Sequence, residues 1–109
     1  MRHVWWLALA VALMPAGCES GPPVVEVTLT EWSVTLSPQT VRAGTVRYNV
    51  VNRGAEPHGF AIEGQGLEQI VPLGGSTTRE TLTPAGGWQV FCPLPGHRDR
   101  GMRAELDVR

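Results

Sequence analysis

Apolar and polar residues alternate along most of this 109-residue chain once its first 23 residues are set aside. Successive side chains of a β-strand point to opposite faces, so this period of two predicts strands with one buried face. Short segments typical of turns separate the runs: SPQ, RAG, NRG, EGQG, PLGG and TPAGG. Six to eight short strands at this spacing favour an all-β fold, an antiparallel β-sandwich. The positions expected to face its core are Val25, Val27, Leu29, Trp32, Val34, Leu36, Val46, Tyr48, Val50, Phe60, Ile62, Trp88, Val90, Cys92, Met102, Ala104, Leu106 and Val108.

The first 17 residues have the composition of a secretory signal peptide. Arg2 precedes an apolar run from Val4 to Met14, and Ala16 and Gly17 are small residues that suit a cleavage site. The apolar run is too short to span a membrane as a helix. We therefore expect residues 1–17 to be removed and the protein to be exported, to the periplasm or the cell surface.

The small residues lead directly into Cys18, as in the lipobox of bacterial lipoproteins, where the cysteine is acylated. Pro15 stands at the position where that motif usually has Leu, so cleavage by an ordinary signal peptidase is the alternative. We expect residues 18–23 to form a lipidated cysteine and a short membrane tether. Residues 24–109 then form a single domain, expected to be a monomer.

Charge and cysteine count exclude two kinds of protein. From Glu19 onward the chain has eight Arg against ten Asp and Glu, a net charge of −2, whereas nucleic-acid binding favours a basic face. With Cys18 lipidated or removed, Cys92 has no intramolecular partner, so a disulfide framework is excluded. A bound metal is the remaining way to stabilise a small exported domain.

The residues that suit a soft metal lie in two loops. Cys92, His97 and Met102 follow one another at intervals of five, and His58 lies upstream in NRGAEPHGF. Taken singly, each residue has an ordinary interpretation as core filling or as a surface side chain. Together they provide a thiolate, two imidazoles and a weak thioether, the ligand set typical of type 1 copper. Zinc is the alternative metal, but a thioether is a poor ligand for it. A Cys–His nucleophile pair is the enzymatic alternative, and no motif that would orient its base is evident.

The segment FCPLPGHRDRGM, with His58 upstream, resembles the ligand loop of the cupredoxins, the small blue copper proteins. Its C-x4-H-x4-M spacing is looser than that of plastocyanin and is similar to that of auracyanin-type members. The resemblance implies a Greek-key cupredoxin sandwich with one type 1 copper per chain, bound by His58, Cys92, His97 and Met102. An Asn commonly follows the first histidine in this family, and here that residue is Gly59. The backbone N–H of Gly59 is still able to donate a hydrogen bond to the Cys92 sulfur.

The resemblance further implies an electron carrier and not an enzyme. We expect single electrons to pass between protein redox partners, such as a cytochrome or a membrane electron-transfer complex, through the exposed edge of His97. A copper-binding module for copper delivery or storage is the alternative. Residues expected around His97 are an apolar rim of Pro57, Leu94 and Pro95 and a positive collar of Arg98, Arg100 and Arg103.

Overall fold

The computed structural model describes His3 and residues 21–109. Most of the predicted signal peptide, the predicted lipidation site Cys18 and the first part of the tether lie outside the described residues. Within the part that is described, no helix is long and apolar enough to cross a membrane.

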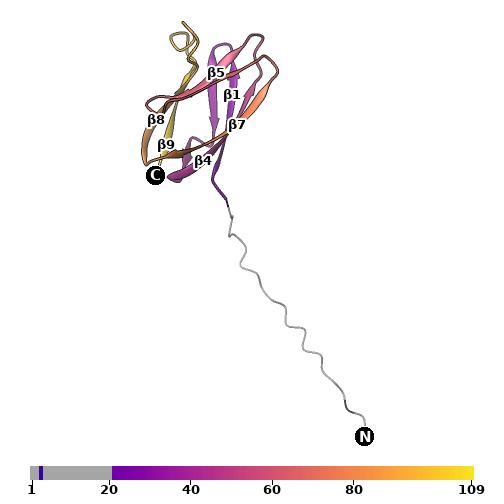
Figure 1. Ribbon diagram of the computed structural model, residues 1–109, viewed down its shortest axis with the longest axis vertical. Helices are drawn as coiled ribbons and strands as arrows, with labels where there is room; N and C mark the ends of the chain where they lie inside the picture. Colours follow the sequence, from indigo (N-terminus) through magenta and orange to yellow (C-terminus); the bar gives the residue numbers. More distant parts are fainter. Residues whose placement is uncertain (1–2, 4–20) are drawn as a thin grey trace.

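Two β-sheets packed face to face make up the domain (Figure 1). The first sheet has the strand order β2-β1-β4-β7, and the second has the order β3-β9-β8-β5-β6. The expected β-sandwich is thereby confirmed. Its strands are β1 (Val24–Thr30), β2 (Ser33–Ser37), β3 (Thr40–Val41), β4 (Gly44–Asn52), β5 (His58–Ile62), β6 (Leu67–Val71), β7 (Ser76–Thr83), β8 (Gly86–Phe91) and β9 (Arg103–Val108).

Both sheets are mixed, because two strand pairs are parallel and the others are antiparallel. After β2 the chain leaves the first sheet and contributes β3 to the edge of the second, parallel to β9. It then returns as β4 on the other side of β1 and parallel to it. Two strands joined by a tight hairpin are antiparallel. Because the chain passes through the second sheet between β2 and β4, β4 can pair with β1 in the parallel direction.

The core consists of the side chains that alternation predicts to face inward. Of the expected set, all are buried except Trp32, Trp88 and Ala104, which are partly buried and pack against the core. Trp32 also lies in the turn between β1 and β2 and not in a strand. Tyr48 and Phe60 pack against each other at the centre, with ring centroids 5.4 Å apart.

Strand β7 was not predicted, because every residue of its sequence STTRETLT except Leu82 is polar. It lies at the edge of the first sheet, opposite the edge strand β6 of the second. Polar side chains join the two sheets along this edge: Arg79 donates to Gln69 Oε1 at 2.9 Å, and Thr81 donates to Gln65 Oε1 at 3.3 Å. At this edge the two sheets are therefore held together by hydrogen bonds between polar side chains.

The ends of the sandwich differ in what they carry. Strand β1 begins at the end where the C-terminus lies, whereas the loop between β8 and β9 lies at the opposite end (Figure 1). That loop contains His97, and His58 begins β5. The predicted ligand residues are therefore far from the place where the described domain begins.

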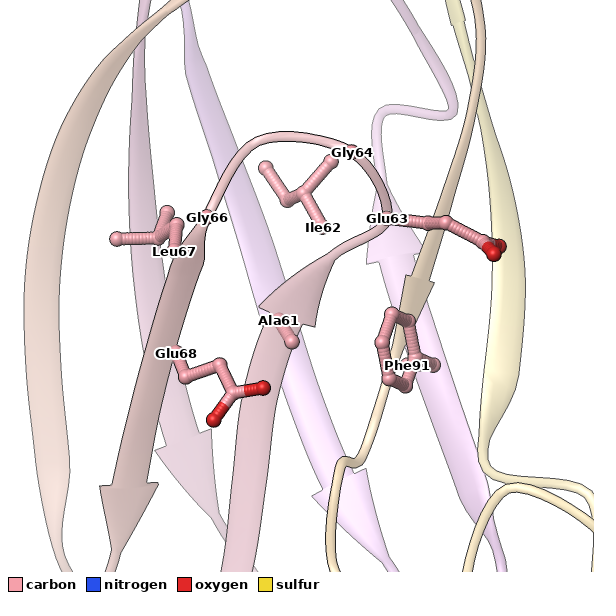
Figure 2. A pocket seen from close by; sticks show the side chains of 8 residues that line it. All are labelled: Ala61, Ile62, Glu63, Gly64, Gly66, Leu67, Glu68 and Phe91. Atoms are coloured by element: carbon pink, nitrogen blue, oxygen red, sulfur yellow. The ribbon is translucent and has the colours of Figure 1, made fainter.

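A hollow of about 150 Å³ lies on the outer face of β5 (Figure 2). It exists because Ala61 is short and pairs with the longer residues Glu68 on one side and Phe91 on the other. Figure 2 shows the Glu63 side chain pointing away from the hollow. None of the predicted ligand residues lines it, so we assign it no part in the site.

Candidate metal centre

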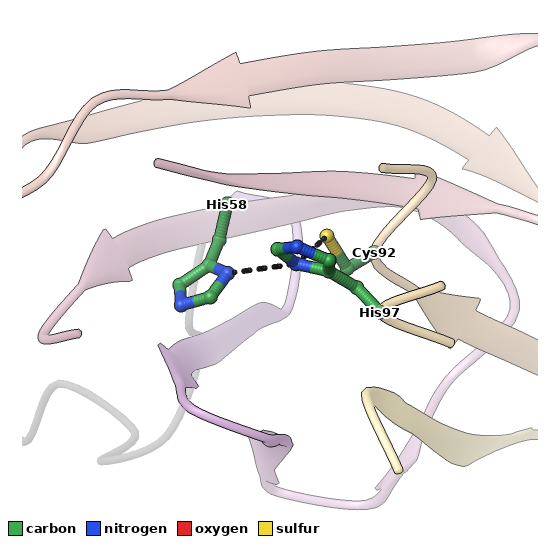
Figure 3. A group of neighbouring side chains, drawn as sticks. All are labelled: His58, Cys92 and His97. Atoms are coloured by element: carbon green, nitrogen blue, oxygen red, sulfur yellow. Dashed lines mark hydrogen bonds between the residues drawn. The ribbon is translucent and has the colours of Figure 1, made fainter. Parts of the chain in front are cut away.

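Three of the four predicted ligand residues converge at one point. The ligand atoms of His58, Cys92 and His97 all lie within 4.8 Å of one another. The Nδ1 atoms of His58 and His97 are 3.2 Å apart, and the Cys92 Sγ is 3.5 Å from His97 Nδ1 (Figure 3). The fold thus brings together one thiol and two imidazoles that lie up to 39 residues apart in the sequence.

Strand pairing creates this convergence. His58 is the first residue of β5, and Cys92 directly follows β8, the antiparallel neighbour of β5. Because Ala61 pairs with Phe91, continuing the register brings the start of β5 alongside the residues just after β8. His97 follows in a loop whose backbone is held by its own hydrogen bonds, including one from His97 N to Leu94 O at 3.1 Å.

Met102 is adjacent to the cluster through its backbone. Its N–H donates to His97 O at 3.2 Å, and its carbonyl accepts from Cys92 N at 3.1 Å. Its side chain is fully buried. These contacts place Met102 between the other two loop residues, and its role as fourth ligand stays a prediction.

The outer nitrogen of each histidine faces a carboxylate. His58 Nε2 lies 3.0 Å from Glu31 Oε1, and His97 Nε2 lies 3.4 Å from Glu56 Oε1. A carboxylate oxygen accepts hydrogen bonds, so the contact with Glu31 favours the His58 hydrogen on Nε2. The His58 Nδ1 atom then faces the interior of the cluster, 3.2 Å from His97 Nδ1 (Figure 3). Metal–imidazole bonds are about 2.0–2.1 Å long, so one ion can contact both nitrogens and the donor set fits a metal.

The Glu31 carboxyl group is held in its ionised form. Partial desolvation acts to raise its pKa, but hydrogen bonds together outweigh that effect and hold the pKa below its ordinary value. Their donors are the backbone N–H of Ala55 at 2.7 Å, the backbone of Glu31 itself, His58 and the backbone N–H of Glu56 at 3.1 Å.

The Cys92 sulfur is fully buried and accepts a hydrogen bond from Gly59 N at 3.2 Å. This contact confirms that Gly59 can donate to the sulfur although it lacks the side chain of the Asn common in the family. The reason for glycine is steric, because a Cβ on Gly59 would lie 2.7 Å from Pro93 Cδ and 3.3 Å from Ile70 Cδ1. The Pro93 ring fills the space that an Asn would need.

No protein-family model matches this chain, and no curated protein matches it either. Among solved structures, auracyanin B, a cupredoxin, is similar with a TM-score of 0.64. That likeness covers 80% of this chain and 88% of the auracyanin B chain, at 19% sequence identity. The chain has the cupredoxin fold. Identity this low shows the fold alone, and it is the His58, Cys92 and His97 cluster within that fold that suggests copper.

Trp32 covers the cluster in this cupredoxin fold. Its ring makes edge contacts with His97 and with His58, at centroid distances of 4.9 Å and 6.2 Å. The Arg100 guanidinium lies 4.4 Å above the Trp32 ring. As a result the His97 side chain is only 13% exposed, less than the open edge expected from the sequence.

The expected positive collar is weaker than predicted. Arg98 folds back against the Phe91 ring, 4.0 Å from its centroid, and pairs with Glu63 at 2.5 Å. It also donates to Gln89. The charge of Arg98 is therefore paired within the domain, and Arg100 and Arg103 are the exposed members of the collar. The apolar rim changes too, because Leu94 packs against the core whereas Pro57 and Pro95 are exposed.

Sequence reasoning missed the two carboxylates that lie beside the histidines. Glu31 and Glu56 lie in turns where a glutamate is usually an ordinary surface residue. Asn52 is buried and donates to Glu56 O at 2.9 Å and to Val71 O at 3.0 Å, and it accepts from Gly54 N at 2.9 Å. The only available signal was the turn segment NRG, in which an Asn side chain often bonds to nearby backbone.

Proposed function

We propose that this protein is a type 1 (blue) copper protein that carries single electrons between redox partners. One observation supports the proposal above all others: a buried thiol and two imidazole nitrogens converge in a cupredoxin fold. His58, Cys92 and His97 would hold one copper ion per chain, with Met102 as a weak fourth ligand. The bound copper would supply one-electron redox chemistry.

The ligand residues suit a carrier because burial and backbone hydrogen bonds hold them in place. His58 and Cys92 are fully buried, and the backbones of Cys92 and His97 are both hydrogen-bonded to Met102. Side chains held in this way keep one geometry through a change of oxidation state, which favours fast electron transfer.

Burial also disfavours the alternative of copper delivery or storage. A delivery module needs ligands that a partner can reach, whereas the described cluster has two fully buried ligands and a third that is 13% exposed. We propose the carrier for this reason. Rapid removal of copper by a weak chelator would favour the delivery module.

An enzymatic function based on a Cys–His nucleophile has one observation in its favour. Glu56 lies 3.4 Å from His97 Nε2 and could orient that ring toward the Cys92 thiol 3.5 Å away. However, Cys92 has no exposed surface, so a substrate could not reach the sulfur. The fold also suggests a carrier and not an enzyme.

The proposed partners are proteins such as a cytochrome or a membrane electron-transfer complex. Electrons would pass at the end of the sandwich where His97 and Trp32 lie in edge contact. Exposed apolar residues border this end, including Pro57, Pro95 and Leu73, which is 60% exposed. Arg100 and Arg103 would favour an acidic partner, so the association rate should fall as ionic strength rises. A rate independent of salt would argue against steering by these residues.

Export and lipid anchoring through Cys18 remain part of the proposal. An anchor there would attach the domain close to the start of β1, at the end opposite the ligand loop (Figure 1). The metal cluster would then face away from the membrane surface. The intact mass of the native protein tests this, since a mature chain that starts after Cys18, or one with an unmodified Cys18, would contradict lipidation.

Metal analysis of the purified protein tests the central proposal. After copper is added and excess is removed, we expect one copper per chain, retained in competition with an equal concentration of zinc. Preferential retention of zinc, or no stable metal at all, would contradict a type 1 copper site.

A further inference from the structure

Glu31 makes contacts that join three parts of the site. It lies in the two-residue turn between β1 and β2, 27 residues before His58. One oxygen, Oε1, is 3.0 Å from His58 Nε2, 2.7 Å from Ala55 N and 3.1 Å from Glu56 N. A single carboxylate thus holds both the imidazole ring of His58 and the loop that leads into it.

Gly54 makes room for this contact. A Cβ built on Gly54 would lie 2.5 Å from Glu31 Oε1 and 2.7 Å from His58 Nε2, closer than real side chains approach. Gly54 is itself fixed by a hydrogen bond from its N–H to the buried Asn52 side chain. The contact between Glu31 and His58 therefore requires glycine at position 54. An incidental surface contact would place no such requirement on a third residue.

We propose that Glu31 is a positioning residue for the metal centre. Its carboxylate fixes the hydrogen of His58 on Nε2 and so directs the Nδ1 lone pair at the metal, and its charge favours the oxidised ion. The second part of this inference rests on the proposed copper function. The first part concerns the protein without metal.

The physical reasons are those known for carboxylates behind metal-bound histidines. A carboxylate that accepts the outer N–H fixes the tautomer and the ring orientation, and it increases the basicity of the ligating nitrogen. A stronger nitrogen donor and a nearby negative charge both stabilise Cu(II) more than Cu(I). Glu31 should therefore lower the reduction potential.

Four variants separate these effects. Glu31→Gln keeps an oxygen acceptor and removes the charge, whereas Glu31→Ala removes both. Gly54→Ala leaves Glu31 in the chain but places a methyl group in the contact. Glu80→Gln is the matched control, because it removes the same charge from an exposed carboxylate on β7, at the opposite edge of the same sheet.

The first measurement uses the metal-free protein. The ¹⁵N shifts of the His58 imidazole report which nitrogen carries the hydrogen, and we expect Nε2–H in the wild type, Glu31→Gln and Glu80→Gln. Glu31→Ala and Gly54→Ala should show a mixture of tautomers. A mixture in the wild type, or an unchanged Nε2–H form in Glu31→Ala and Gly54→Ala, would overturn the positioning role.

The second measurement uses the copper-loaded protein. Glu31→Gln should shift the equilibrium between Cu(II) and Cu(I) about tenfold toward Cu(I), which for one electron is about 59 mV. Glu31→Ala should in addition weaken copper binding by about 10–100-fold, and Glu80→Gln should change neither quantity measurably. Equal potentials in wild type, Glu31→Gln and Glu80→Gln would overturn the electrostatic role.

Failure of this inference is distinguishable from failure of the proposed function. If the wild type bound no copper, the proposed function would fail, and the tautomer measurement on metal-free protein would still judge Glu31. If the wild type bound copper and the Glu31 variants behaved like Glu80→Gln, only the present inference would fail. If Glu31→Ala did not fold, Glu31→Gln and Gly54→Ala would decide by the same readouts.

Discussion

The Pro93 ring packs directly on the backbone of Gly59, where a Cβ would lie 2.7 Å from Pro93 Cδ. Both residues adjoin ligand positions, since Gly59 follows His58 and Pro93 follows Cys92. In place of the Asn that is common in cupredoxins, close packing of a proline on a glycine joins the two segments. Adding a single methyl group at Gly59 therefore tests whether the two residues pack this closely.

Gly59→Ala should lower the free energy of unfolding by about 1–3 kcal/mol, because overpacking forces Pro93 to move. Gly87→Ala is the matched control: it also lies in a strand, and its Cβ would come no closer than 3.9 Å to its nearest neighbour, Glu105 Oε2. Alanine there should be neutral or slightly stabilising. Urea unfolding of the metal-free proteins measures both changes, and equal stability of the two variants would contradict the packing described.

The buried hydroxyl of Tyr48 should make the free energy of unfolding depend on pH in the alkaline range. Its hydroxyl is buried and hydrogen-bonded to Thr83 at 2.9 Å. Burial raises the pKa of Tyr48 above its ordinary value of 10.0, although the bond to Thr83 acts in the opposite direction. Because the folded pKa exceeds the unfolded one, the stability that this difference contributes is complete below about pH 10 and is lost as the pH rises further.

Tyr48→Phe should cost about 0.5–1.5 kcal/mol at neutral pH through loss of the hydrogen bond, and the variant should lack this alkaline loss. The chain contains one Tyr and no Lys, so few other groups titrate between pH 9 and 12. Thr83→Val removes the same bond but keeps the phenol, so it should keep the alkaline loss. Unfolding free energies measured from pH 8 to 11.5 check this, and parallel curves for wild type and Tyr48→Phe would contradict it.

Met102 should tune the reduction potential without being needed for copper binding. An amide oxygen is a harder donor than a thioether and stabilises Cu(II) more, so Met102→Gln should lower the potential. Met102→Leu removes the donor and should raise the potential, while its similar volume keeps the stability loss below about 1.5 kcal/mol. Voltammetry of the three forms decides, and equal potentials would show that Met102 is core filling alone.

The strands that carry the cluster could be predicted because apolar residues recur at every second position: Phe60 and Ile62 in β5, Trp88 and Val90 in β8, and Ala104, Leu106 and Val108 in β9. His58 begins β5, Cys92 directly follows β8 and Met102 directly precedes β9, so the period of two predicts where each of these residues stands. Strand β7 escaped prediction because hydrogen bonds, which leave no periodic pattern, hold its inward face.

The surroundings of the histidines could not be predicted for a different reason. Glu31 and Trp32 reach His58 and His97 from the β1–β2 turn, and only the packing of the two sheets brings that turn to the loop. A turn glutamate or tryptophan has no sequence pattern that indicates such a contact. The same packing places Trp32 against His97, so the low exposure of His97 could not be predicted from the sequence either.

The visible absorption spectra of the copper-loaded wild type and Cys92→Ser show whether the Cys92 thiolate binds the copper ion. A thiolate bound to Cu(II) gives an intense charge-transfer band, so the wild type should be blue or green and Cys92→Ser should lose the band. Cys18→Ser, the same substitution at the chain's other cysteine, should keep it. A band that survives Cys92→Ser, or a wild type that stays colourless with Cu(II) bound, would contradict a type 1 copper site.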